Sequence, residues 1–305
     1  KEALQTLPGE TIDAELAGRL AQARGKVRVA LIEVVGQRRI VAAVPALLTA
    51  ADDTDMQVRA AALTALGETV TAEELPVLIQ RVVAAADDEG ANKALRNACI
   101  RMPDREACAA QLINAMPQAP VAAQVTFIKI LGAMGGSRAL GALSAAAKEG
   151  NDALKDAASE LLGTWMTTDA APVLMEIARV VREEKYKIRA VRGYLRIAKQ
   201  IETRPEARVE LCQAILPLCR RDEEKKLVVT ALEPKPTAAG LKLVVSLLKQ
   251  AAVKDEAGRA AVAMAEELIK SDKAAVAEAM QQVIAAGGKP EVVNRAKELA
   301  EQAKR

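Results

Sequence analysis

Apolar residues recur at helical spacing from Val44 to Leu48, and the same spacing returns from Val58 to Leu66. The acidic run from Asp52 to Asp55 separates the two stretches, and acids of this kind favour a helix N-terminus. Gly67 follows and can end a helix by taking a positive φ. The pattern predicts a helix, a tight turn and a second helix. Because one such hairpin has too little core to be stable alone, it must stack on copies of itself.

Similar hairpins follow one another along the chain, with an average spacing of about 33 residues per unit. The residues in phase with Val58 are Val27, Ala123, Leu154, Ile188 and Glu224. No alternation typical of a strand extends beyond a few residues. We therefore predict an all-α fold of about nine helix pairs.

The regularity of the hairpins changes along the chain. Residues 1–10 contain Pro8-Gly9 and are expected to form an extended lead-in, whereas 11–203 form the regular array. Residues 204–305 are more divergent and end in a polar helix suited to capping the array. The prolines of segment 233–236 predict a kink or a subdomain boundary.

Several landmarks of the best-patterned hairpin resemble those of a HEAT repeat. They are Pro45 in the first helix, an aspartate in the turn, Val58-Arg59 and Leu66-Gly67. This resemblance implies a right-handed, armadillo-like α-solenoid of stacked antiparallel pairs. It also implies a ladder between neighbouring units, in which a turn acid meets a base of the second helix. The residues expected in this structural ladder are Asp55, Arg28, Arg59 and Lys155.

The residue pattern of the chain, around Asp222–Leu232 in particular, is similar to that of alanine-rich HEAT arrays that bacteria attach to larger proteins. Some of those arrays lie beside 3-keto-disaccharide hydrolase-type domains. The chain has no such domain and no catalytic motif of that kind. This resemblance leaves open an accessory or regulatory role within a larger carbohydrate-active enzyme.

Composition supports a helical array and disfavours an enzyme. Hydrophobic residues make up 51% of the chain, aromatic residues 1%, and histidine is absent. The core must therefore consist of closely packed Ala, Leu, Val and Ile. The absence of histidine removes the commonest general base and metal ligand. We predict no catalytic residues, no metal site and no cofactor. There is also no apolar run long enough for a membrane span.

A basic stripe is the clearest candidate binding feature. Ten Lys or Arg and four Glu lie between Arg179 and Arg208, a net charge of +6 in a chain whose total is +3. Five of these bases share one predicted helix face: Lys185, Arg189, Arg192, Arg196 and Lys199. Tyr194 on the same helix and Trp165 one unit earlier could complete a site for an anionic partner. The alternative is a solvated or ion-paired face with two packing aromatics.

The four cysteines have no metal-binding spacing. Cys212 and Cys219 are about 10 Å apart along one predicted helix, too far for a disulfide. Cys99 and Cys108 flank a short turn and could pair, or remain free buried thiols.

These observations favour a non-catalytic interaction or scaffold module that binds a protein or peptide on its concave surface. An enzyme accessory is the alternative, and a nucleic-acid binder is disfavoured because the net charge is small. The chain starts at Lys1 without an apolar targeting stretch. Secretion or a periplasmic location after signal cleavage and a cytoplasmic location both stay open, as does the oligomeric state.

Overall fold

The computed structural model describes residues 9–305, and every regular element in that range is a helix. The predicted all-α fold is confirmed. The chain divides into two compact units, which meet at Ala158 and Ser159 within helix α11. The change from regular to more divergent repeats after residue 203 stays a prediction from the sequence. Most of the expected lead-in, residues 1–8, lies outside the described part of the chain.

The first unit holds the following α-helices: α2 (Glu10–Leu20), α3 (Gly25–Arg38), α4 (Val44–Ala50), α5 (Met56–Thr69), α6 (Leu75–Ala84), α7 (Glu89–Arg101), α8 (Arg105–Ala115), α9 (Val121–Met134), α10 (Ser137–Glu149) and the start of α11 (Asp152–Gly163). Two 3-10 turns, Val41–Ala43 and Met116–Gln118, extend these helices.

The second unit continues with α12 (Ala170–Val180), α13 (Glu184–Arg196), α14 (Pro205–Ile215), α15 (Asp222–Leu232), α16 (Ala238–Ser246), α17 (Ala251–Leu268), α18 (Lys273–Ala286) and α19 (Pro290–Lys304). The π-helix Ile197–Ile201 prolongs α13, and 3-10 turns occupy Leu216–Leu218 and Leu247–Lys249. Over residues 9–305 the α-helices form nine successive pairs, as predicted.

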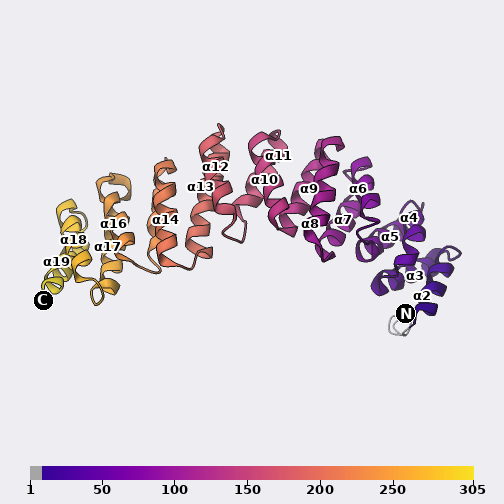
Figure 1. The fold of residues 1–305 in the computed structure, drawn as a ribbon, viewed down its shortest axis with the longest axis horizontal. Helices are drawn as coiled ribbons and strands as arrows, with labels where there is room; N and C mark the ends of the chain where they lie inside the picture. The colour runs from indigo at the N-terminus through magenta and orange to yellow at the C-terminus, as the bar shows by residue number, and fades with distance from the viewer. Residues whose placement is uncertain (1–8) are drawn as a thin grey trace. The chain divides into compact units, whose positions relative to one another are not determined.

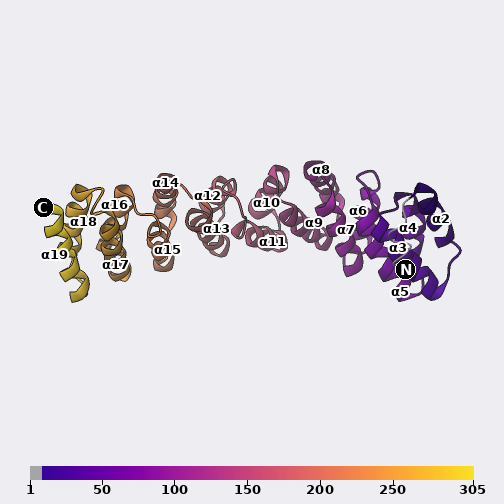
Figure 2. The ribbon, with the colours of Figure 1, turned by 90° about the horizontal axis from the view of Figure 1, so that it is seen from below.

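Each unit has two layers of helices (Figures 1 and 2). The first helix of every pair carries an even number, and neighbouring first helices pack together, as α6 does with α8 and α16 with α18. The odd-numbered second helices form the other layer, in which α5 contacts α3 and α7, and α17 contacts α15 and α19. Stacked pairs of this kind make each unit a stretch of helical solenoid.

Small residues let the second helices approach closely. A Cβ placed on Gly36 would lie 2.8 Å from the Cβ of Ala65, and one on Gly193 would lie 2.8 Å from the Cα of Gly163. Gly67 has the same role, since its Cβ would lie 3.2 Å from the Cα of Ala94. The expectation that Gly67 ends its helix is wrong, because α5 continues to Thr69.

The proline-rich segment 233–236 is a turn between α15 and α16, in agreement with its helix-breaking sequence. The side chain of Thr237 then accepts a hydrogen bond from the Gly240 N–H and caps α16. The Nζ of Lys235 donates to the carbonyl of Thr203 at 3.1 Å. Both neighbours of this turn belong to the second unit, so the turn separates helix pairs within that unit.

Candidate functional site

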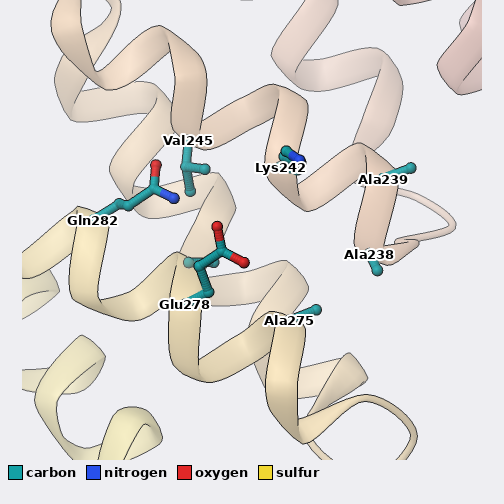
Figure 3. A pocket seen from close by; sticks show the side chains of 8 residues that line it. Ala238, Ala239, Lys242, Val245, Ala275, Glu278 and Gln282 are labelled. Atoms are coloured by element: carbon teal, nitrogen blue, oxygen red, sulfur yellow. The ribbon is translucent and has the colours of Figure 1, made fainter.

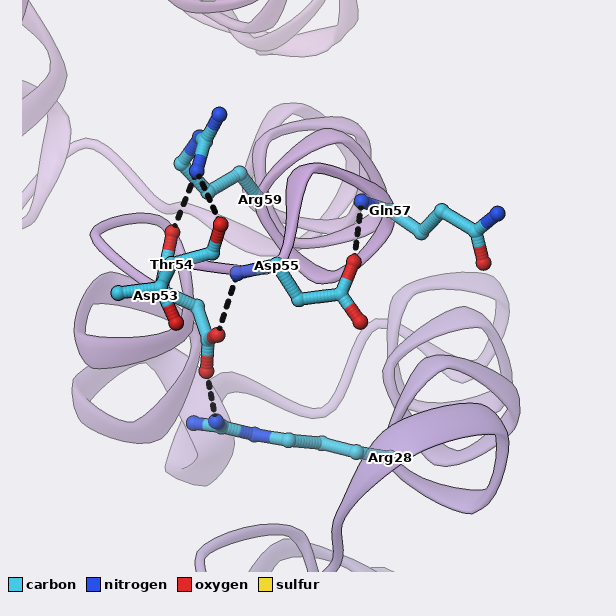
Figure 4. A network of polar contacts seen from close by, with 6 residues as sticks. All are labelled: Arg28, Asp53, Thr54, Asp55, Gln57 and Arg59. Atoms are coloured by element: carbon cyan, nitrogen blue, oxygen red, sulfur yellow. Dashed lines mark hydrogen bonds and ion pairs between the residues drawn. The ribbon is translucent and has the colours of Figure 1, made fainter.

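The turn between α4 and α5 links neighbouring helix pairs through Asp53 (Figure 4). Its carboxylate forms an ion pair with the guanidinium of Arg28 on α3, in the preceding pair. The Arg28 side chain is 17% exposed and the Asp53 side chain 20%, so water screens the ion pair only in part. The other carboxylate oxygen accepts the Asp55 N–H at 2.9 Å. Asp53 therefore orders its own turn and holds the previous pair.

Asp55 and Arg59 act within their own pair. Asp55 is the N-cap of α5 and accepts the Gln57 N–H at 2.8 Å. The Nη1 of Arg59 donates to the carbonyls of Asp53 and Thr54 at 2.7 and 3.0 Å. The expected ladder acid, Asp55, is thus replaced by Asp53. The physical reason is that an N-cap carboxylate is directed at its own helix and cannot also reach α3.

Arg81 was not anticipated from the sequence, although it joins this turn from the following pair. Its Nη2 donates to Asp52 Oδ1 at 2.6 Å and to the Ala51 carbonyl at 2.7 Å. The only indication of this role in the sequence is that Arg81 is a base in the last turn of a first helix. Lys155, the remaining expected base, is half-buried on α11, and its backbone N–H donates to the backbone carbonyl of Asn151.

The basic stripe does not form one free face. Arg189 donates to the hydroxyl of Ser159 at 2.9 Å. Arg196 is half-buried, its Nε lies 2.9 Å from the Gly163 carbonyl, and its Nη2 donates to the Trp165 carbonyl. Burial lowers the pKa of Arg196, although the group remains charged near neutral pH. The members of the stripe that remain exposed to solvent are Lys185, Arg192 and Lys199.

The two aromatic residues proposed for binding are buried. Trp165 is 7% exposed, and its indole N–H donates to Thr167 Oγ1 at 2.8 Å and Asp169 Oδ1 at 3.0 Å. Tyr194 is 4% exposed, and burial raises the pKa of its phenol. The expectation that Trp165 and Tyr194 face a partner is therefore wrong. Tyr194 packs into the core from α13 and Trp165 packs into it from the segment that follows α11, because large aromatic rings are stabilised by removal from water.

The cysteines are free and buried. Contact with the Cys108 thiol and burial raise the pKa of Cys99. Burial raises the pKa of Cys212 and of Cys219 to about 12. Thiols of this kind are poor nucleophiles at neutral pH. Within residues 9–305 no group of His, Cys, Asp and Glu has the geometry to hold a metal ion, and no helix is long and apolar enough to cross a membrane.

An open groove lies between second helices in the first unit. Its volume is about 540 Å³, and its walls include Glu33 and Gln37 of α3 and Gln57, Ala60 and Thr64 of α5. We call it the α3/α5 groove. The close approach of Gly36 to Ala65 brings the two helices together at its floor. Sequence reasoning named none of these residues, because they are ordinary surface positions of amphipathic helices.

Comparison with known proteins identifies the repeats in this part of the chain. Residues 14–98 match the family model described as HEAT repeats. The matched segment extends from α2 into α7 and contains the whole α3/α5 groove. The HEAT resemblance is confirmed there, and HEAT repeats generally mediate protein interaction or scaffolding. No curated protein matches the chain.

Three solved structures that match the chain are designed or engineered proteins. One engineered protein is 18% identical over 99% of this chain and 98% of its own, with a TM-score of 0.31. Another is 17% identical over 96% of both chains, with a TM-score of 0.19. A third, from a computational design of self-assembling cyclic homooligomers, is 14% identical over 99% and 90%, with a TM-score of 0.13. TM-scores this low support no conclusion about function.

None of the three comparisons links the chain to a bacterium or to a 3-keto-disaccharide hydrolase-type protein. That finer resemblance stays a prediction from the sequence.

Proposed function

We propose that the protein is a non-catalytic scaffold that binds a protein or peptide partner along its second-helix layer. The observation that carries this proposal is the α3/α5 groove, which lies wholly inside the segment that matches HEAT repeats. An open groove of about 540 Å³ accommodates several side chains of a partner, and its lack of a deep enclosure suits a polypeptide better than a small substrate.

The chemistry of the groove favours a partner with polar side chains that pair with amides. Gln37 on α3 and Gln57 on α5 place amide groups on its two walls, and these groups both donate and accept hydrogen bonds. The carboxylate of Glu68 is already paired with Arg39 at 3.7 Å. Ala60 and Ala61 have only methyl side chains, so a peptide backbone can lie close to α5 while its side chains meet the amides.

A matched pair of threonine substitutions tests the proposal. Thr64 lies in the groove and Thr49 lies on α4; both are exposed, and each hydroxyl donates to the carbonyl four residues earlier. Thr64→Arg fills the groove, whereas Thr49→Arg adds the same charge outside it. We expect a partner captured from source-cell extract by the wild-type protein to be lost with Thr64→Arg and kept with Thr49→Arg.

The captured partner would then be purified and its affinity measured by isothermal titration calorimetry. We expect Thr64→Arg to weaken binding about 10-fold or more, because a blocked groove excludes the contacts at its centre. Equal affinity for both variants, or a partner retained by neither, would contradict a partner site in this groove.

The exposed part of the basic stripe supports a second contact with an anionic segment of a partner. Arg192 and Lys199 are exposed, and the side chain of neither has an ion pair or hydrogen bond with another described residue. Unpaired surface cations chiefly raise the association rate, and this effect falls with salt. An accessory role in a larger carbohydrate-active enzyme would use the same surfaces, with the partner as its catalytic region.

A further inference from the structure

A second groove lies in the other layer of the second unit, between first helices α16 and α18 (Figure 3). It consists of a hollow of about 230 Å³ and a second of about 320 Å³. Val245 and Gln282 line both hollows, so they form one continuous feature. We call it the α16/α18 groove.

The groove is long enough for three turns of a helix. At one end it is lined by Ala238 and Ala275, and at the other by Lys249 and Ala286. Each wall therefore runs for about 11 residues, which corresponds to about 16 Å along a helix. The two walls run in the same chain direction, because the N-terminal parts of α16 and α18 line the same hollow.

Its floor is apolar and made mainly of small side chains. Val245 and Leu248 come from α16 and its 3-10 extension, and Ala275 and Ala279 come from α18. Alanines at these positions leave room between the helices for side chains of another molecule. Leucine or methionine side chains on a docked helix fill such a groove at a spacing of three or four residues.

The polar side chains around this floor have no partners in residues 9–305. Lys242, Lys249, Glu278 and Gln282 are exposed, and no hydrogen bond or ion pair joins the side chain of any of them to another described residue. In Figure 3, Glu278 and Gln282 rise from α18 next to Val245, and Lys242 lies on α16.

The second-helix layer of the same unit differs in this respect. There the guanidinium of Arg295 on α19 contacts Glu266 of α17 at 2.6 Å and Glu298 at 2.7 Å. These three charges therefore satisfy one another, whereas those around the α16/α18 groove are available to another molecule. Unpaired charges of both signs beside an apolar floor set the orientation of a bound partner.

We propose that the α16/α18 groove binds an amphipathic helix of a partner protein. This inference rests on the proposed scaffold function and assigns a different surface from the α3/α5 groove. The bound helix has about three turns, an apolar stripe, and two acidic residues seven positions apart that meet Lys242 and Lys249. On its other flank a basic residue meets Glu278. A spacing of seven residues suits the bound helix because an α-helix rises about 10 Å over that distance, close to the separation of Lys242 and Lys249 along α16 and its 3-10 extension.

Selection from a displayed peptide library, with the full chain as the target, tests this inference. The library holds 16-residue helical peptides with a fixed leucine and alanine stripe and every flanking position randomised. We expect the enriched peptides to carry two acids seven apart on one flank and a base on the other. Affinities of the enriched peptides are then measured by fluorescence anisotropy against matched variants.

The variants separate the groove from general charge effects. Lys242→Glu combined with Lys249→Glu is expected to weaken binding about 10-fold or more, and a peptide with its acids changed to lysine is expected to recover it. Lys297→Glu on α19 alters an exposed lysine elsewhere in the same unit and is expected to leave affinity unchanged. Circular dichroism confirms that each variant is folded.

Three results would overturn the inference. They are the absence of any enriched helical peptide, binding that ignores the double reversal, and a wild-type dimer in sedimentation that the double reversal dissociates. The last result would assign the groove to a second copy of this chain. Thr64→Arg is expected to leave peptide affinity unchanged. Partner capture that survives Thr64→Arg, with intact peptide binding, therefore shows that the α3/α5 proposal has failed. Partner capture that is lost with Thr64→Arg, with no peptide binding by the wild type, shows that the α16/α18 proposal has failed.

Discussion

At the scale of residues, two arginines share one structural role across helix pairs. Arg101 donates from Nε to the Gly67 carbonyl at 3.4 Å and from Nη2 to that of Val70. Arg196 repeats the arrangement with Gly163 and Trp165. The last carbonyls of a helix lack partners within it, and a cation suits the negative end of the helix dipole. Each arginine therefore caps the helix of the preceding pair.

This role predicts different costs for two arginines on α13. Arg196→Met removes the hydrogen bonds to Gly163 and Trp165 and is expected to lower the free energy of unfolding by about 1–3 kcal/mol. Arg192→Met alters an exposed side chain, and the expected change is below about 0.5 kcal/mol. Urea unfolding followed by circular dichroism measures both. Equal losses would contradict the capping role.

At the scale of elements, the second helices pack where a residue lacks a side chain or has only a methyl group. The contact of Gly193 with Gly163 joins α13 to α11, and that of Gly67 with Ala94 joins α5 to α7. Helices at such short separation are held by many small dispersion contacts, which suits a core with few aromatic rings. The spacing between pairs therefore depends on single glycines.

A pair of glycine substitutions measures this dependence. Gly193→Ala would place a Cβ 2.8 Å from the Gly163 backbone, so α13 must shift, at an expected cost of about 1–3 kcal/mol. Gly141 lies in α10 with nothing within 4 Å of its added Cβ. Gly141→Ala is expected to stabilise by about 0.5–1 kcal/mol. Thermal unfolding distinguishes them, and stabilisation by both substitutions would exclude a tight contact at Gly193.

At the scale of the whole molecule, each helix contacts mainly the next members of its layer and its own hairpin partner. In the first unit α5 packs on α3, α4 and α7, and in the second α17 packs on α15, α16, α18 and α19. Arrays built from neighbour contacts have stabilities that add along the chain and can open locally. A disturbance in one pair should therefore weaken its neighbours most.

Hydrogen exchange of the full chain provides the corresponding test. Gly67→Ala crowds Ala94 and is expected to speed amide exchange in α3, α5 and α7. Exchange in α16 to α19 is expected to match that of the wild type, because no contact in that region changes. Faster exchange by the same factor in every helix would show instead that the chain opens only as a single cooperative unit.

The sequence by itself determined the helical class, the number of pairs and the HEAT resemblance. These properties depend on local signals: the period of apolar residues, the acids in turns and the prolines between helices. The turn before α5 shows where prediction from the sequence stops. The N-cap position of Asp55 could be expected, whereas the contact of Asp53 with Arg28 could not. Both aspartates have the same chemistry, and their partners depend on which direction each carboxylate takes from the turn.

Only the tertiary structure decided which charges are available to a partner. The sequence grouped Arg192 and Arg196 on one helix face. In the structure Arg192 is exposed, whereas Arg196 donates to the carbonyl of Gly163, 33 residues earlier, and caps the helix that ends there. It also gave no sign of the α3/α5 and α16/α18 grooves. A groove is the space left between side chains of helices from two different pairs. The shape of a groove therefore depends on the distance between those two helix pairs, and the local sequence pattern of one pair does not determine that distance.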